Sequence, residues 1–110
     1  MNLNSISKIF LLFVVLFTSS LSYAEATWID VRSKVEHTLD NIEGDVRISH
    51  DEIVTSVKGM FPDKSTEIRL YCRSGGRAGK AMSALKTAGY KNVSNAGSIE
   101  DARKERGLGD

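Results

Sequence analysis

The sequence predicts an α/β fold in which a central, mostly parallel sheet is flanked by helices on both faces. Short apolar segments typical of strands alternate along the chain with segments whose apolar residues recur at helical spacing. This alternation favours parallel strands that are joined by helices. The only cysteine, Cys72, lies where one expected strand ends and a helix follows. Because ligands bind beyond the carboxyl ends of the strands in such sheets, this position is the first candidate for a site.

The first half of the fold is expected to hold two strands and two helices. TWIDV, residues 27–31, predicts a short buried strand, and SKVE, residues 33–36, has the spacing of a capping box at a helix start. GDVRI, residues 44–48, predicts a second strand. SHDE, residues 49–52, repeats the capping spacing before an apolar stripe, and Pro62 ends that segment.

The second half repeats the alternation. EIRLYC, residues 67–72, predicts a strand that leads into the centre of the sheet. Small and apolar residues recur at helical spacing from Ala78 onward, and Gly89 is expected to end that helix. KNVSN, residues 91–95, predicts a last strand, and SIED, residues 98–101, predicts the start of a closing helix.

The start of the chain is expected to be a signal peptide. A weakly basic start precedes the apolar run IFLLFVVLF, residues 9–17, and small residues follow, with Ser22 and Ala24 at minus three and minus one of a cleavage site. The run is shorter than the roughly 20 apolar residues of a spanning helix, although an uncleaved anchor is the alternative. We therefore expect a signal peptide at residues 1–24 and a single domain at residues 25–110.

Export makes the single cysteine informative. Cysteines in oxidising compartments usually pair, and Cys72 has no partner within its own chain. An unpaired cysteine in an exported protein indicates a reactive thiol or an intermolecular bond. The alternative, from the cysteine count alone, is a buried residue that packs as a small hydrophobe.

The charge pattern indicates an anionic partner near Cys72. Lys and Arg number 15 and Asp and Glu number 14, so the chain is almost neutral. Residues 68–99 nevertheless carry several basic residues and no acidic one, whereas residues 25–67 are mainly acidic. Neutral net charge with scattered basic residues argues against nucleic-acid binding.

The segment CRSGGR, which begins at Cys72, has the composition of an anion cradle. Gly75 and Gly76 allow backbone N–H groups to point inward, and the helix that follows adds unpaired donors and the positive end of its dipole. The thiolate of Cys72 is such an anion, so its pKa should fall below the usual value of about 8.5. Arg73 and Arg77 add positive charge for an anionic substrate.

Elimination narrows the chemistry of this thiol. Four residues separate Cys72 from Arg77, one fewer than a cysteine phosphatase loop needs, and there is no Cys-x-x-Cys pair for thiol–disulfide exchange. His37 and His50 lie near expected helix starts, and we interpret them as surface residues rather than as the base of a cysteine protease. One cysteine and two histidines at unrelated spacings make a poor ligand set, so no metal or cofactor is expected. What remains is the acceptance of a sulfur atom as a persulfide, an anion that the same amides can hold.

These residues resemble a known family. The stretch YCRSGGRAGKAMSALKTAGYKNVSNAGS, together with WIDVR at residues 28–32 and NIEGDVRI at residues 41–48, is similar to single-domain rhodaneses, which are thiosulfate sulfurtransferases. FPDKSTEIRLYC, which ends at Cys72, resembles the small periplasmic phage-shock rhodaneses. The resemblance implies a rhodanese-like parallel sheet and, with the expected signal peptide, a periplasmic enzyme without membrane contact after cleavage.

The resemblance also implies a role for each matching residue. Cys72 would take the outer sulfur of thiosulfate, or of another sulfane-sulfur donor, release sulfite, and pass the sulfur to cyanide or a thiol. Asp30 and Arg32 would brace the loop without reacting. The substrate-binding cradle would consist of Arg73, Ser74, Gly75, Gly76 and the loop arginine Arg77.

Most departures from the family pattern lie in or beside the second expected strand. The family usually has His, Ala, Asn and Pro where this chain has Asn41, Asp45, Arg47 and Ser49, and Gly-Gly is more common at residues 97–98. They bear on local packing and substrate access rather than on sulfur chemistry. Two alternatives stay open: a non-catalytic module that binds an anion or a partner, and a thiol reductase or peroxidase-like enzyme, for which a resolving cysteine is lacking.

Overall fold

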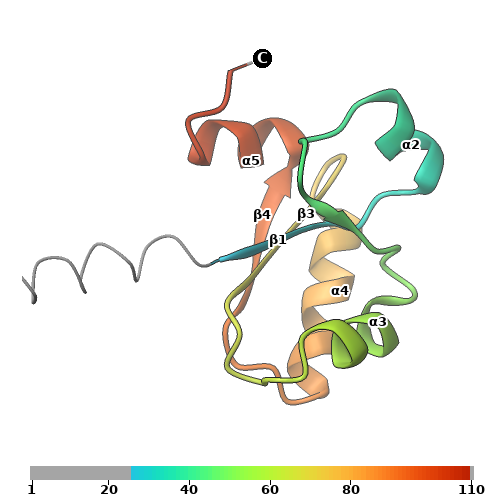
Figure 1. Cartoon of the computed structure of the whole chain (residues 1–110), viewed down its shortest axis with the longest axis vertical. Helices are drawn as coiled ribbons and strands as arrows, with labels where there is room; N and C mark the ends of the chain where they lie inside the picture. Colours follow the sequence, from blue (N-terminus) through green and yellow to red (C-terminus); the bar gives the residue numbers. More distant parts are fainter. Residues whose placement is uncertain (1–25, 110) are drawn as a thin grey trace, which may run out of the picture.

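The computed structural model describes residues 26–109, which form a four-stranded sheet in which every strand runs parallel to its neighbours (Figure 1). The strands are β1 (Thr27–Asp30), β2 (Val46–Arg47), β3 (Ile68–Cys72) and β4 (Val93–Ser98). Their order across the sheet is β2-β1-β3-β4, so β1 and β3 are central. The four predicted strands are confirmed, although β2 is shorter than its predicted segment and β4 extends beyond it.

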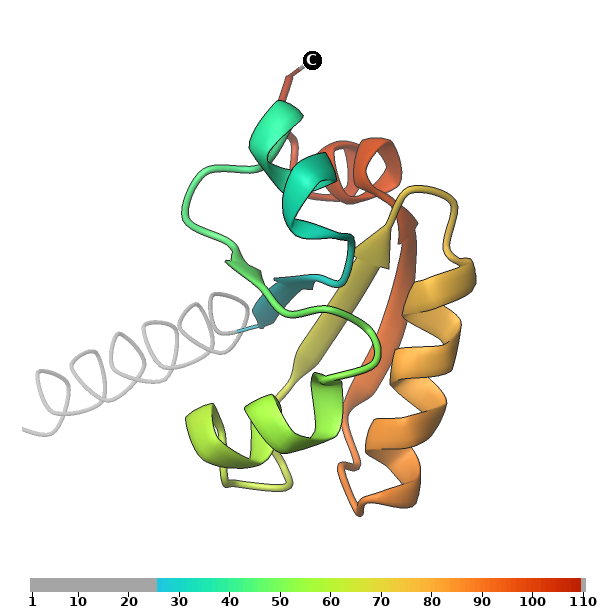
Figure 2. The ribbon, with the colours of Figure 1, turned by 90° about the vertical axis from the view of Figure 1, so that its right-hand side faces the viewer.

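Helices cover both faces of the sheet, which confirms the predicted architecture. They are α2 (Lys34–Leu39), α3 (Ile53–Met60), α4 (Gly76–Thr87) and α5 (Ile99–Glu105). α3 and α4 pack together on one face, and α5 lies against β3 and β4 on the other. Figure 2 shows α2 at the carboxyl ends of the strands, near the turn that leads from β3 into α4.

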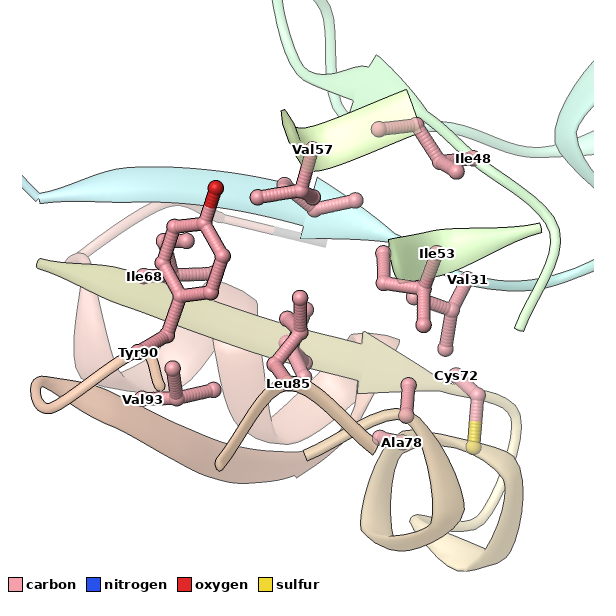
Figure 3. Close-up of a cluster of buried hydrophobic side chains, with 13 residues drawn as sticks. Val31, Ile48, Ile53, Val57, Ile68, Cys72, Ala78, Leu85, Tyr90 and Val93 are labelled. Atoms are coloured by element: carbon pink, nitrogen blue, oxygen red, sulfur yellow. The ribbon is translucent and has the colours of Figure 1, made fainter. Parts of the chain in front are cut away.

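The two faces bury separate apolar clusters, and the alternation of side chains along β3 contributes to both. Leu70 and Cys72 belong to the larger cluster with α3 and α4, whereas Tyr71 belongs to the smaller cluster with α5. Figure 3 shows Cys72 at the edge of the larger cluster, next to Ala78 of α4. The cysteine therefore lies where the apolar core meets the carboxyl end of the sheet.

Side-chain caps determine where two short helices begin. The Ser33 hydroxyl accepts from the Glu36 N–H, and the Glu36 carboxylate accepts from the Ser33 N–H. This confirms the capping box predicted at α2. Ser98 and Asp101 form the same motif at α5, so the predicted closing helix is confirmed.

The capping box predicted at residues 49–52 is wrong. The Ser49 hydroxyl donates to the Asp51 carboxylate instead of capping a helix, and α3 begins only at Ile53. Glu52 stands at the N-cap without a side-chain hydrogen bond to the helix. A local Ser–Asp hydrogen bond has thus replaced the cap that the spacing predicted.

α4 begins earlier than predicted and ends where predicted. Its expected start was Ala78, but the helix begins at Gly76 because Gly75, in the left-handed conformation (φ 96°), turns the chain into it. At the other end, the N–H groups of Gly89 and Tyr90 donate to carbonyls of the last turn in a Schellman arrangement. Gly89 has φ 100°, which confirms its predicted role as the terminator.

The predicted signal peptide, residues 1–24, lies outside the described residues. Within residues 26–109, none of the helices has the length and apolar character needed to cross a bilayer.

Candidate active site

Cys72 lies at the carboxyl end of the central strand β3, between strand and helix as predicted. The residue is only 1% exposed, and its thiol is free. Figure 3 shows its sulfur directed towards the start of α4. Residues 72–77, which we call the cysteine turn, run from the end of the strand into the first turn of that helix.

The backbone of the cysteine turn surrounds the sulfur with donors. The Gly75 N–H donates to the Cys72 Sγ at an N–S distance of 2.9 Å. Burial raises the pKa of Cys72, but hydrogen bonds from backbone N–H groups outweigh it, so the net pKa lies below that of an ordinary thiol. Those N–H groups belong to Ala78, Ser74, Gly75 and Arg77. A thiolate stabilised in this way can act as a nucleophile without an adjacent base.

β4 holds the cysteine turn in place through residues to which the sequence analysis gave no role. The Asn95 amide donates to the Gly75 carbonyl at 2.9 Å, and the Asn95 side-chain oxygen accepts from the Gly97 N–H at 2.8 Å. A Cβ on Gly75 would lie 3.3 Å from the Gly97 Cα, so both the space and the positive φ favour glycine there.

The sequence contained a signal for this contact in the family-like run Asn95-Ala96-Gly97. What it could not show is the register shift between β3 and β4, where Leu70 pairs with Asn95 but Tyr71 pairs with Gly97. The extra residue changes the alignment of β4 just before the cysteine turn.

The two arginines of the cysteine turn have different surroundings. Arg77 forms a bidentate ion pair with Glu36 of α2, with N–O distances of 2.6 and 2.9 Å. Ser33 binds the same carboxylate through its N–H and its hydroxyl. Arg73 is exposed and makes no hydrogen bond or ion pair with any residue in 26–109. The turn therefore carries one neutralised and one uncompensated guanidinium group.

Asp30 and Arg32 are buried at the end of β1 and bind each other. The Arg32 side chain donates to both Asp30 carboxylate oxygens and to the Asp40 carbonyl, and the His37 Nδ1 lies 2.9 Å from the Asp30 Oδ2. Burial raises the pKa of Asp30, but hydrogen bonds from Arg32 and His37 lower it more. These contacts anchor α2, and α2 contacts the cysteine turn through Glu36. The interpretation of His37 as an ordinary surface residue is corrected, because its ring is partly buried against Asp30.

A surface pocket of about 260 Å³ opens beside the cysteine turn. Arg73 of the turn lines it together with Glu36 and Leu39 of α2 and with Ile99 and Glu100 of α5. Its position next to Arg73 makes it the candidate binding place for a small anionic or thiol substrate.

Asp45, which stands where the family usually has alanine, has its own partners. It accepts a hydrogen bond from the Tyr71 hydroxyl at 2.7 Å and pairs with Arg106 at 2.6 and 3.0 Å. The Arg106 guanidinium also lies over the Trp28 ring, 4.5 Å from its centroid. The acidic residue is thus part of the packing against Tyr71 and Trp28, on the face that α5 covers.

Two further departures bind backbone carbonyls. Asn41 donates to the His37 carbonyl at the end of α2, and Arg47 donates to the Arg32 carbonyl. Both contacts stabilise the segment between β1 and β2 rather than the surroundings of the sulfur.

Comparison with known proteins decides the family. A sequence model described as the Rhodanese-like domain matches residues 18–104. The chain belongs to the rhodanese family. Thiosulfate sulfurtransferase PspE of Escherichia coli (strain K12) is 32% identical to this rhodanese over 91 residues, which are 83% of this chain and 88% of PspE.

Solved structures of other proteins have the same fold as this rhodanese. The structure titled "rhodanese with anions from E. coli" is 32% identical, with a TM-score of 0.66 over 69% of this chain and 89% of that chain. The human single-domain sulfurtransferase TSTD1, 22% identical, shares the fold with a TM-score of 0.62 over 81% of this chain and 90% of that chain. This single-domain rhodanese is an enzyme, a sulfurtransferase. The roles of Cys72, of the cradle and of the Asp30–Arg32 pair stay predictions.

Proposed function

We propose that this rhodanese moves the outer sulfur of thiosulfate to cyanide or a thiol through a persulfide on Cys72. The observation that carries the proposal is the group of backbone N–H donors around the sulfur, with the Gly75 N–H at 2.9 Å. These donors stabilise a thiolate before the reaction, and they can stabilise a persulfide anion after it. Identity of 32% to thiosulfate sulfurtransferase PspE supports thiosulfate as the donor.

The proposed reaction consists of two sulfur transfers. The Cys72 thiolate attacks the outer sulfur of thiosulfate, the S–S bond of thiosulfate breaks, and its electron pair leaves with sulfite. Cyanide or a thiolate then attacks the outer sulfur of the persulfide, which leaves as thiocyanate or as a new persulfide. The second step restores the Cys72 thiolate. Because neither step moves a proton, a site with amide donors and no general base suits the reaction.

The remaining predicted site residues support the sulfur and its anionic donor. Exposed Arg73 lines the pocket and supplies positive charge, and the buried pair of Asp30 and Arg32 braces the cysteine turn through α2. The main-chain donors to the sulfur come from Ser74, Gly75, Arg77 and Ala78.

The test is the formation of thiocyanate from thiosulfate and cyanide by the purified protein. Cys72→Ser should reduce turnover to background, because a hydroxyl is a far weaker nucleophile than a thiolate at neutral pH. A circular dichroism spectrum equal to that of the wild type would show that the variant is folded. Turnover retained by folded Cys72→Ser would refute the proposal.

We also propose that the enzyme acts in the periplasm, as residues 25–110 after removal of a signal peptide at residues 1–24. The apolar run and the small residues at Ser22 and Ala24 support this. The intact mass of the protein from the periplasmic fraction of an expressing Gram-negative cell should match a chain that begins at Glu25. A chain found only in the cytoplasm or membrane fraction, with residues 1–24 still attached, would contradict it.

A further inference from the structure

The arginines of this rhodanese differ in whether their charge is compensated. Within residues 26–109, Asp or Glu carboxylates form ion pairs with five of them, which are Arg32, Arg69, Arg77, Arg103 and Arg106. Arg47 instead donates to the Arg32 backbone carbonyl, away from the cysteine turn. Arg73 is exposed, lines the pocket beside the cysteine turn and has no such partner in that range.

The partner of Arg77 is held firmly. The Glu36 carboxylate binds the guanidinium through two hydrogen bonds and also accepts from the Ser33 N–H at 3.1 Å and the Ser33 hydroxyl at 2.9 Å. The hydrogen bond from Arg77 holds the pKa of Glu36 well below its usual range. The carboxylate is therefore ionised at neutral pH and cancels the charge of Arg77.

The position of α2 depends on this pair. None of the residues Lys34–Leu39 is buried, and the apolar side chains Val35 and Leu39 are 68% and 81% exposed. α2 is therefore held to the body of the protein mainly by polar contacts, of which the Glu36–Arg77 pair is the one that reaches the cysteine turn. An anion that drew Arg77 away would break two charged hydrogen bonds and release one wall of the pocket.

We propose that the Arg77 side chain does not bind the substrate anion but forms, with Glu36, a neutral clasp between α2 and the cysteine turn, and that Arg73 selects anionic donors. The proposal rests on the proposed function for the nature of the donor. Glu36 is then a positioning residue, and Arg73 is the residue that determines charge specificity. Glu100 is the other charged residue lining the pocket that has no ion pair within residues 26–109. Its negative charge disfavours an incoming anion, whereas the positive charge of Arg73 favours it.

The test compares alkylation of Cys72 by iodoacetate, an anion, with alkylation by iodoacetamide, which is neutral. The ratio of the two rate constants at one pH and low salt reports the charge that an incoming anion meets, because the thiolate fraction cancels. The variants are Glu36→Gln, Arg77→Gln, the double variant, and Arg73→Gln. Alkylation needs no sulfur transfer, so the result is independent of whether thiosulfate is the donor.

The clasp predicts opposite effects of the single changes and their cancellation in the double variant. Glu36→Gln should raise the ratio about threefold and Arg77→Gln should lower it about threefold, as expected for one uncompensated charge near the surface. The double variant should return to the wild-type ratio, and Arg73→Gln should lower the ratio in both the wild-type and the double-variant backgrounds. If the double variant instead gives the low ratio of Arg77→Gln, Arg77 acts on the anion directly and the proposal fails.

Two controls make the comparison decisive. Glu105→Gln breaks the Arg69–Glu105 pair, which lies outside the pocket lining, and should leave the ratio unchanged. Glu100→Gln removes an uncompensated carboxylate from the lining and should raise the ratio, which calibrates the assay. If a single variant fails to fold, the ratios of the double variant and of Arg73→Gln are each compared with the wild-type ratio. An unchanged ratio in Arg73→Gln would also overturn the proposal.

Discussion

At the scale of single residues, two opposing effects act on the sulfur of Cys72. The residue is 1% exposed, and burial disfavours the charged thiolate. Backbone N–H groups act in the other direction and prevail, so the pKa of Cys72 is lowered. Because these donors belong to one short turn, the conformation of Gly75 determines whether their N–H groups point towards the sulfur.

The first prediction concerns the pKa of this thiol. The rate of Cys72 alkylation by iodoacetamide should follow a titration with its midpoint below about 8.5, the value of a free cysteine. Since the folded pKa is lower than the unfolded pKa, this group stabilises the fold above the unfolded pKa, and that stabilisation is lost as the pH falls through the folded pKa. Mass spectrometry of the alkylated protein measures the rate. A midpoint at or above 8.5 would show that the backbone N–H groups do not lower the pKa of Cys72.

The second prediction compares neighbouring glycines. Gly75→Ala should lower the free energy of unfolding by about 1–2 kcal/mol, because a side chain disfavours the left-handed conformation. Its Cβ would also lie 3.3 Å from the Gly97 Cα. Gly76→Ala, in α4 with nothing within 4 Å of the added Cβ, should instead raise stability by about 0.5–1 kcal/mol. Urea unfolding checks both variants, and equal effects would show that the conformation of Gly75 is unimportant.

At the scale of elements, short-range patterns were predictable and long-range side-chain contacts were not. The capping boxes at Ser33 and Ser98 and the end of α4 at Gly89 depend on residues within one turn, so their spacing sufficed. The Glu36–Arg77 pair joins residues that are far apart in the chain, and no local sequence pattern predicts it. The same holds for Asn95, which reaches the cysteine turn only because the register of β4 shifts.

The third prediction concerns the contact between Asp45, which precedes β2, and Arg106, which follows α5. Asp45→Ala should lower the free energy of unfolding by about 2–3 kcal/mol, because it leaves the Arg106 guanidinium and the Tyr71 hydroxyl without their partner. Asp51→Ala, at an exposed position, should leave the free energy of unfolding nearly unchanged. Chemical denaturation measures both. A loss of stability in Asp51→Ala equal to that in Asp45→Ala would show that the partly buried Asp45–Arg106 pair is unimportant.

At the scale of the whole molecule, ionised carboxylates form hydrogen bonds that hold together the segments around the cysteine turn. Hydrogen bonds from Arg77 lower the pKa of Glu36, and those from Arg103 lower the pKa of Asp40. In Asp30, burial raises the pKa, but the hydrogen bonds from Arg32 and His37 lower it more. The parallel sheet itself was predictable from alternating strands and helices, whereas this network depends on the folded arrangement of α2 and α5.

The fourth prediction is the acid sensitivity of the fold. Because the folded pKa values of these carboxylates lie below the unfolded values of about 4, their stabilising effect is present above pH 4 and is lost as the pH falls through the folded values. The free energy of unfolding should therefore be nearly flat from about pH 6 to 7 and fall steeply below about pH 4.5. Asp30→Asn should be less stable at neutral pH and show a shallower fall. Urea titrations at each pH check this, and a wild-type stability that rises towards pH 3 would contradict it.

Intact mass measurements can detect a persulfide on Cys72, the proposed carrier of the transferred sulfur. The purified protein would be weighed before incubation with thiosulfate, after it, and again after addition of cyanide, with Cys72→Ser alongside. Sulfur transfer through a Cys72 persulfide should add the mass of one sulfur atom, which cyanide removes and which Cys72→Ser does not gain. An unchanged mass in a folded, reduced protein, or the same gain in Cys72→Ser, would contradict it.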